Sequence, residues 1–64
     1  MKVVFGRFED NTLINIKAFE DIEIITQTKD KNDNDCEVWS LIDEDDIEYI
    51  LRCNVWTLHS ITNK

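Results

Sequence analysis

Residues 36–53 decide the fold: CEVWSLI is followed by the acids DEDD and then by IEYILRC. In the second run, Ile47, Tyr49, Leu51 and Cys53 occupy every second position. A period of two is typical of a β-strand with one buried face. Folding the two runs onto each other about the four acids therefore predicts an antiparallel hairpin.

The register of this hairpin follows from the residues that should meet across it. A fold about the centre of DEDD sets Ile42 opposite Ile47 and Trp39 opposite Ile50. Apolar side chains then face apolar ones, as favourable cross-strand pairs do. The same register pairs Val38 with Leu51, Ser40 with Tyr49, Glu37 with Arg52, and Cys36 with Cys53.

A helix at about 44–52 is the alternative for the second half of this stretch. Asp45 is a suitable N-cap, Glu48 follows three residues later, and Arg52 lies near the end. Such a helix would make the protein α+β.

Other β-branched and aromatic runs surround the hairpin, and a bend at Glu20 and Asp21 separates two of them. With one Gly and no Pro, the turns must use Asp, Asn and Lys. We predict an all-β fold, a five- or six-stranded antiparallel meander that curls into a small, partly open barrel. The predicted strands are residues 2–8, 12–19, 22–28, 36–42, 47–53 and 55–61.

Extending the register to residues 22–28 sets Ile22 opposite Ile42 and Ile24 opposite Ser40. One face of this sheet is then predicted to form the core. The other face carries an apolar row that is either covered by the terminal strands or left as a contact site. The predicted core face holds Ile22, Ile24, Val38, Ile42, Ile47, Tyr49, Leu51, Cys36 and Cys53, and the row on the opposite face is Ile25, Trp39 and Ile50.

The charge of the chain limits its partners. Its 64 residues form a single small domain, 1–64, in which 14 acids outnumber 7 bases for a net charge of -7. Such a surface repels nucleic acid and membranes and attracts basic protein surfaces. No apolar run is long enough for a membrane span or a secretory signal, and two Cys are too few for a disulfide framework. We therefore expect a cytoplasmic protein whose two Cys are buried thiols, with a cross-strand disulfide between Cys36 and Cys53 as the alternative under oxidising conditions.

Catalytic and metal sites find little support in the sequence. His59 is the only histidine, and no serine lies in a nucleophile elbow, so we expect no enzyme and no catalytic residue. Cys36, Cys53 and His59 give too few ligands for zinc. Residues 30–41 start like a calcium loop, but Asp35 replaces the turn glycine and Leu41 the final glutamate. We expect no metal and no cofactor.

These exclusions leave protein binding. We predict a non-enzymatic module that inhibits a nucleic-acid-binding or defence protein, with acids that imitate phosphates and an apolar anchor at Ile25, Trp39 and Ile50. The alternative is a homodimeric accessory protein whose interface is the row around Trp39 or Trp56 and whose acids only maintain solubility. The acids of the predicted binding site are Asp30, Asp33, Asp35, Glu37, Asp43, Glu44, Asp45, Asp46 and Glu48.

The composition, rich in Ile, Asn, Asp and Lys and poor in Gly and Pro, is similar to that of small accessory proteins of phages and mobile elements. Some of those proteins inhibit host or defence proteins, and some act as DNA mimics. The resemblance is one of composition, and no motif or site residue is carried over from it.

Overall fold

A computed structural model describes residues 1–63 and shows six β-strands. The strands are β1 Lys2–Glu9, β2 Thr12–Phe19, β3 Ile22–Lys29, β4 Glu37–Asp43, β5 Glu48–Arg52 and β6 Thr57–Thr62. The all-β prediction is confirmed. The alternative helix at 44–52 is wrong, because these residues form a turn followed by β5. No helix that could cross a membrane is found in residues 1–63.

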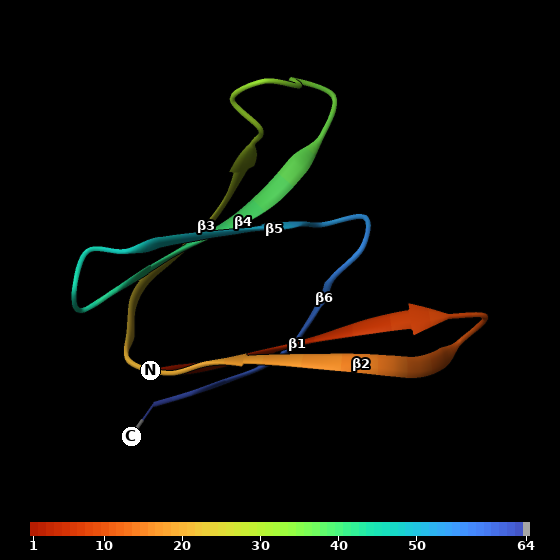
Figure 1. Cartoon of the computed structure of the whole chain (residues 1–64), viewed down its shortest axis with the longest axis horizontal. Helices are drawn as coiled ribbons and strands as arrows, with labels where there is room; N and C mark the ends of the chain where they lie inside the picture. Colours follow the sequence, from red (N-terminus) through yellow and green to blue (C-terminus); the bar gives the residue numbers. More distant parts are fainter. Residues whose placement is uncertain (64) are drawn as a thin grey trace.

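The strands form two antiparallel sheets of three strands, ordered β2-β1-β6 and β3-β4-β5. The sheets face each other without closing into a barrel (Figure 1). β2 continues into β3 through the predicted bend, where Asp21 has a φ of 58°. The Met1 ammonium donates to Ile22 O at 2.8 Å and Ile22 N donates to Met1 O at 2.9 Å, so two hydrogen bonds hold the start of β1 against the start of β3.

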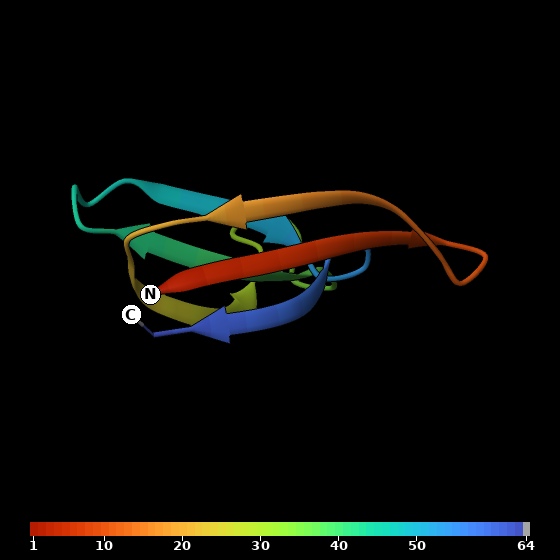
Figure 2. The same cartoon turned by 90° about the horizontal axis from the view of Figure 1, so that it is seen from below.

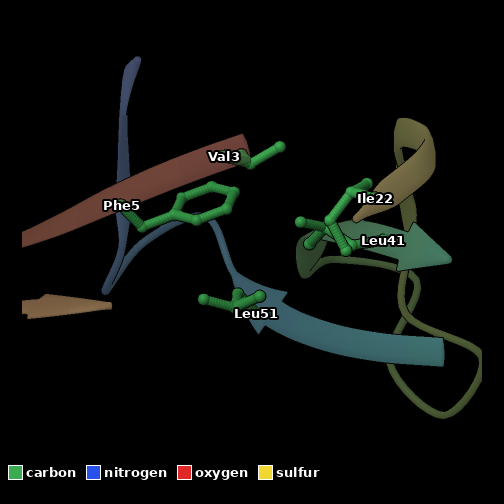
Figure 3. Close-up of a cluster of buried hydrophobic side chains, with 5 residues drawn as sticks. All are labelled: Val3, Phe5, Ile22, Leu41 and Leu51. Atoms are coloured by element: carbon green, nitrogen blue, oxygen red, sulfur yellow. The ribbon is translucent and has the colours of Figure 1, made fainter. Parts of the chain in front are cut away.

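The core lies between the inner faces of the two sheets (Figure 3). It consists of five buried side chains, Val3, Phe5, Ile22, Leu41 and Leu51. Aromatic rings of both sheets extend it: Phe5 lies 6.0 Å from Trp39, and Phe19 lies 5.2 Å from Tyr49, measured between ring centroids. Both distances fall within the range of favourable aromatic pairs.

The predicted β4–β5 register is wrong by one residue. Ile42 lies opposite Glu48 and Ser40 opposite Ile50, whereas Ile47 belongs to the turn. The cause is the loop: Asp43 N donates to Ile47 O at 3.1 Å, and Asp46 adopts a φ of 63°. A three-residue hairpin loop that ends in a left-handed residue replaces the symmetric fold about DEDD.

This slip has a large effect on the faces, because neighbouring residues of a strand point to opposite sides. The β3–β4 register differs from prediction by two residues, with Ile24 opposite Ile42, and that shift leaves the faces of β3 and β4 matched. The predicted core face is nevertheless wrong: Ile24 and Ile47 are each 51% exposed, and Leu41 is fully buried instead. Val38 and Leu51 are both buried but do not share a face, since Val38 pairs with Arg52.

Candidate functional site

The charge of the molecule is divided between its two layers. Residues 20–54, which span the β3-β4-β5 sheet and its connections, contain twelve of the fourteen acids and three of the seven bases. This half therefore carries a net charge of -9, and the rest of the chain carries +2. We call residues 20–54 the acidic layer. Its acids gather mainly at the two ends of the sheet, where β3 meets β4 and where β4 meets β5.

The first end is the β3–β4 loop, drawn at the top of Figure 1. Asp30 Oδ1 accepts a hydrogen bond from Asn32 N at 3.0 Å, and Asp33 Oδ1 accepts one from Asp35 N at 3.1 Å. These short side chains shape the loop, as Asp does in Asx turns. Asp33 and Asp35 remain exposed and Asp30 is half-buried. In residues 1–63, no three His, Cys, Asp or Glu side chains are placed to hold a metal ion.

Glu37 begins β4 beside this loop. Its carboxylate accepts a hydrogen bond from Gln27 Nε2 at 3.1 Å and lies 3.5 Å from Lys29 Nζ, so part of its charge is already balanced. Glu37 O also accepts from Cys53 N at 3.0 Å, so Cys53 lies opposite Glu37 and the predicted pairing of the two cysteines is wrong. Both thiols are free.

The second end is the β4–β5 turn, where Asp43 differs from the other acids. It is only 9% exposed, and its carboxylate accepts three hydrogen bonds: Asp45 N at 2.9 Å, Ile47 N at 3.0 Å and Tyr49 Oη at 3.1 Å. The bond to Asp43 raises the pKa of the Tyr49 phenol above 10.0, and burial and the charges of Asp43 and Asp45 act in the same direction. Asp43 therefore builds the turn and is not available to a partner.

The exposed acids of this turn gain neighbours that the sequence did not reveal. Glu44 N donates to Asp21 O at 3.1 Å, which brings the bend between the sheets beside the turn. Five exposed acids are thus gathered at one end of the molecule: Glu20, Asp21, Glu44, Asp45 and Asp46. Their separation along the chain hides this proximity, which the hydrogen bond between Glu44 N and Asp21 O creates.

The predicted apolar row does not exist as a single surface. Ile25 and Trp39 lie on the inner face, half-buried against the core cluster, so the terminal strands cover them. Ile50 is 53% exposed on the outer face, and the one-residue slip in register sets it opposite Ser40 instead of Trp39. Trp56 is also half-buried, and Lys17 Nζ lies 4.9 Å from its ring centroid. The two tryptophans of the predicted dimer interface, Trp39 and Trp56, are thus both partly buried against the core cluster.

The outer face of the acidic layer carries a different apolar group. Ile24 on β3 is 51% exposed, pairs with Ile42 on β4, and shares the face with Ile50 on β5. Glu48 also belongs to this face, and the buried Ser40 hydroxyl donates to its Oε2 at 2.6 Å. Next to them is a hollow of about 220 Å³. Its lining is Thr28, Lys29, Asp30, Lys31, Asn32, Val38, Ser40, Glu48 and Ile50.

The sheet thus presents exposed isoleucines and a fixed carboxylate between two acidic ends. Such an arrangement offers a partner two kinds of contact, since isoleucine provides apolar surface and the acids provide charge. Sequence alternation could have placed Ile24 and Ile50 on the same face of the sheet, but only with the correct register. Comparison of the chain with protein-family models, curated proteins and solved structures finds no match.

Proposed function

We propose that this protein is a non-enzymatic binding module whose acidic layer docks on the basic surface of another protein. The observation that carries the proposal is the unequal division of charge, with -9 in residues 20–54 and +2 in the remainder. Acids that served solubility alone have no reason to gather in one layer. A charged layer instead orients a partner during encounter and suppresses contact with acidic proteins.

The partner class follows from the same charges. Basic protein surfaces are common where a protein holds nucleic acid, because binding to phosphates depends on Lys and Arg. The module would occupy such a surface and exclude the nucleic acid, which makes it an inhibitor of a nucleic-acid-binding or defence protein. Ile24 and Ile50 provide the apolar contact, and Glu48, fixed by Ser40, provides a carboxylate of defined direction for an Arg or Lys of the partner.

The experiment is affinity capture from the source cell's lysate at low salt and at about 0.5 M salt, at which charges are screened within a few Å. We expect one nucleic-acid-binding or defence protein that is retained at low salt, weakened at high salt and displaced by added duplex DNA or RNA. Retention that is insensitive to salt would contradict the electrostatic contact, and a partner unaffected by nucleic acid would contradict mimicry.

Two matched variants locate the contact. Asp45→Lys and Glu9→Lys change the net charge equally, but Asp45 lies at the exposed acidic end of β4–β5 whereas Glu9 lies on the β1–β2 hairpin. We expect Asp45→Lys to weaken capture by about tenfold and Glu9→Lys to change it little, because a lost or reversed charge contact at an interface is worth on the order of 1.4 kcal/mol or more. Equal effects would show that net charge alone matters.

A further inference from the structure

The outer face of the other sheet, β2-β1-β6, is a second surface that the proposed function does not use. Figure 2 looks onto this sheet, with β1 between β2 and β6. Val3 and Phe5 point into the core, so the alternate residues of β1 point outward, together with their partners on β2. Three large side chains there are about half exposed: Phe8 at 47%, Leu13 at 47% and Ile16 at 55%. We call Val4, Gly6, Phe8, Leu13, Ile16 and Ala18 the apolar face.

The side chains of the apolar face pack against one another and form a continuous surface. Phe8 and Leu13 close over Gly6, the only glycine of the chain, and a Cβ at that position would lie 3.1 Å from both Leu13 Cδ1 and Phe8 Cε1. Beside them lies a hollow of about 50 Å³ lined almost wholly by apolar atoms. An apolar hollow of this kind favours a methyl or isobutyl group over water. The residues around it are Val4, Phe5, Gly6, Phe8, Leu13, Ile16 and His59.

No acid belongs to this face, although the chain has fourteen. Its ionisable neighbours are Lys2, outward on β1 beside Val4, Glu20, which lies next to Lys2 where β2 ends, and His59 at the hollow. Contiguous exposed apolar side chains on a highly charged protein are typical of a contact site. Absence of charge from the centre of a patch is the usual composition of an interface core.

The division of charge indicates a second copy of the chain as the occupant. If two copies meet through their apolar faces, their acidic layers lie on opposite outer sides of the pair, separated by roughly three sheet spacings, or about 30 Å. That is several Debye lengths at physiological ionic strength, where the length is about 8 Å. Any contact that involves the acidic layer of either copy brings like charges together or leaves the apolar face exposed. Contact through the apolar faces alone avoids both.

The small core agrees with this occupant. A stable interface needs about 800 Å² per partner, which is about a sixth of the 4797 Å² of surface on this chain. A chain of this size gains little stability from its core alone, and self-association is one of the usual remedies. The free edge of β2 is a less suitable contact, since Ile16 N already donates to Asn15 Oδ1 at 2.9 Å and is not available to an added strand.

We propose that the protein forms a symmetric dimer through the apolar face of the β2-β1-β6 sheet. Each copy contributes the same patch, so Phe8, Leu13 and Ile16 of one subunit pack against those of the other, as a two-fold axis requires. The dimer presents two acidic layers that face away from each other. This proposal does not depend on the proposed function, because it concerns the opposite face of the molecule.

The test is sedimentation equilibrium of the full chain and of two matched variants, Ile16→Glu and Ile50→Glu. The two isoleucines are exposed to the same extent, 55% and 53%, but lie on the outer faces of different sheets. We expect a wild-type dimer that persists or strengthens at about 0.5 M salt, since salt screens repulsion between acidic chains. Ile16→Glu is expected to weaken self-association at least tenfold, and Ile50→Glu is expected to leave it unchanged.

Circular dichroism and thermal unfolding of both variants establish that each remains folded, and Phe8→Ser serves as a second substitution on the apolar face. A wild type that stays monomeric at millimolar concentration would overturn the proposal. Equal loss of the dimer in Ile16→Glu and Ile50→Glu would also overturn it, because a head-to-tail contact between the two sheets predicts that result. A dimer that neither Ile16→Glu nor Phe8→Ser weakens would place the interface elsewhere.

Discussion

The hydroxyl of Tyr49 donates a hydrogen bond to Asp43 Oδ2 at 3.1 Å, and the Tyr49 ring packs 5.2 Å from Phe19 of the other sheet. One side chain thus connects the acidic β4–β5 turn with the contact between the layers. The first acid of DEDD is a structural residue, whereas the three acids after it are exposed.

Asp43→Ala should destabilise the protein far more than Asp45→Ala. The substitution removes the acceptor of three hydrogen bonds, at a cost of about 2–4 kcal/mol if each contributes about 1 kcal/mol. Asp45 is exposed, and its loss should change the free energy of unfolding by less than about 0.5 kcal/mol. Urea denaturation followed by tryptophan fluorescence measures both. Similar values for the two variants would contradict the role of Asp43.

The phenol of Tyr49 should titrate above its usual pKa of 10.0, because its hydroxyl donates to a carboxylate and ionisation would break that bond. Tyr49 is the only tyrosine, so ultraviolet absorbance against pH reports this residue alone. Asp43→Asn should lower the pKa toward 10.0 by removing the charge. A wild-type midpoint at or below 10.0 would show that the hydrogen bond is absent in solution.

The same shift makes the fold sensitive to alkali. Since the folded pKa of Tyr49 exceeds the unfolded one, the neutral phenol favours the folded state. This contribution is complete below about pH 10 and is lost as the pH rises through the folded pKa. Thermal unfolding as a function of pH should show the loss in the wild type and a smaller one in Tyr49→Phe. If the wild type and Tyr49→Phe lost the same stability at alkaline pH, ionisation of Tyr49 would not be the cause of that loss.

The apolar row was predicted to be either covered by the terminal strands or exposed as a contact site. The variants Trp39→Ala and Ile50→Ala should show that Trp39 is covered and Ile50 is exposed. Trp39 packs against Phe5 in the core, so its loss should cost about 2–4 kcal/mol, most of what a domain of this size has. Ile50 is 53% exposed, and its loss should cost less than about 1 kcal/mol. Chemical denaturation of each variant measures the change in the free energy of unfolding. If both variants lost little and equal free energy of unfolding, Trp39 would have to lie on the surface rather than in the core.

Asn15→Ala should increase aggregation with little loss of stability. The Asn15 side chain accepts from Ile16 N at 2.9 Å on a strand that pairs only with β1, and the variant would release that amide. Free amides on an apolar edge strand invite pairing with other chains. Light scattering during prolonged incubation measures the effect, with Asn34→Ala in the exposed loop as the control. Equal scattering from both would show that the bond does not protect the edge.

Much of the fold could be predicted from the sequence, because strand alternation is a local property. β2 was predicted with its exact bounds, and the other strands were predicted to within two residues at either end. The register was not predictable in the same way. Whether the β4–β5 loop has three or four residues depends on Asp46 entering the left-handed region, and nothing in four consecutive acids marks which residue will do so.

The candidate site was predictable to the extent that it is local. The loop at residues 30–35 and the turn at residues 43–46 are acidic in sequence and lie at opposite ends of the sheet, as expected from a hairpin. Glu20 and Asp21 joined the second end only through the contact between Asp21 and Glu44. Ile25 and Trp39 were misplaced because one residue of slip exchanges the faces of a strand.

The turns of this protein link its backbone geometry to its acidity. Its four residues with positive φ in the described chain are Asp10, Asn11, Asp21 and Asp46, whereas its only glycine lies within β1. After Gly, Asn and Asp tolerate this conformation best. The backbone conformation therefore favours Asp at three of these positions, independently of any partner that the protein binds. During evolution, these positions would accept Asn or Gly more readily than Lys or Ser, so the acidity of this chain can fall gradually but cannot easily reverse at its turns.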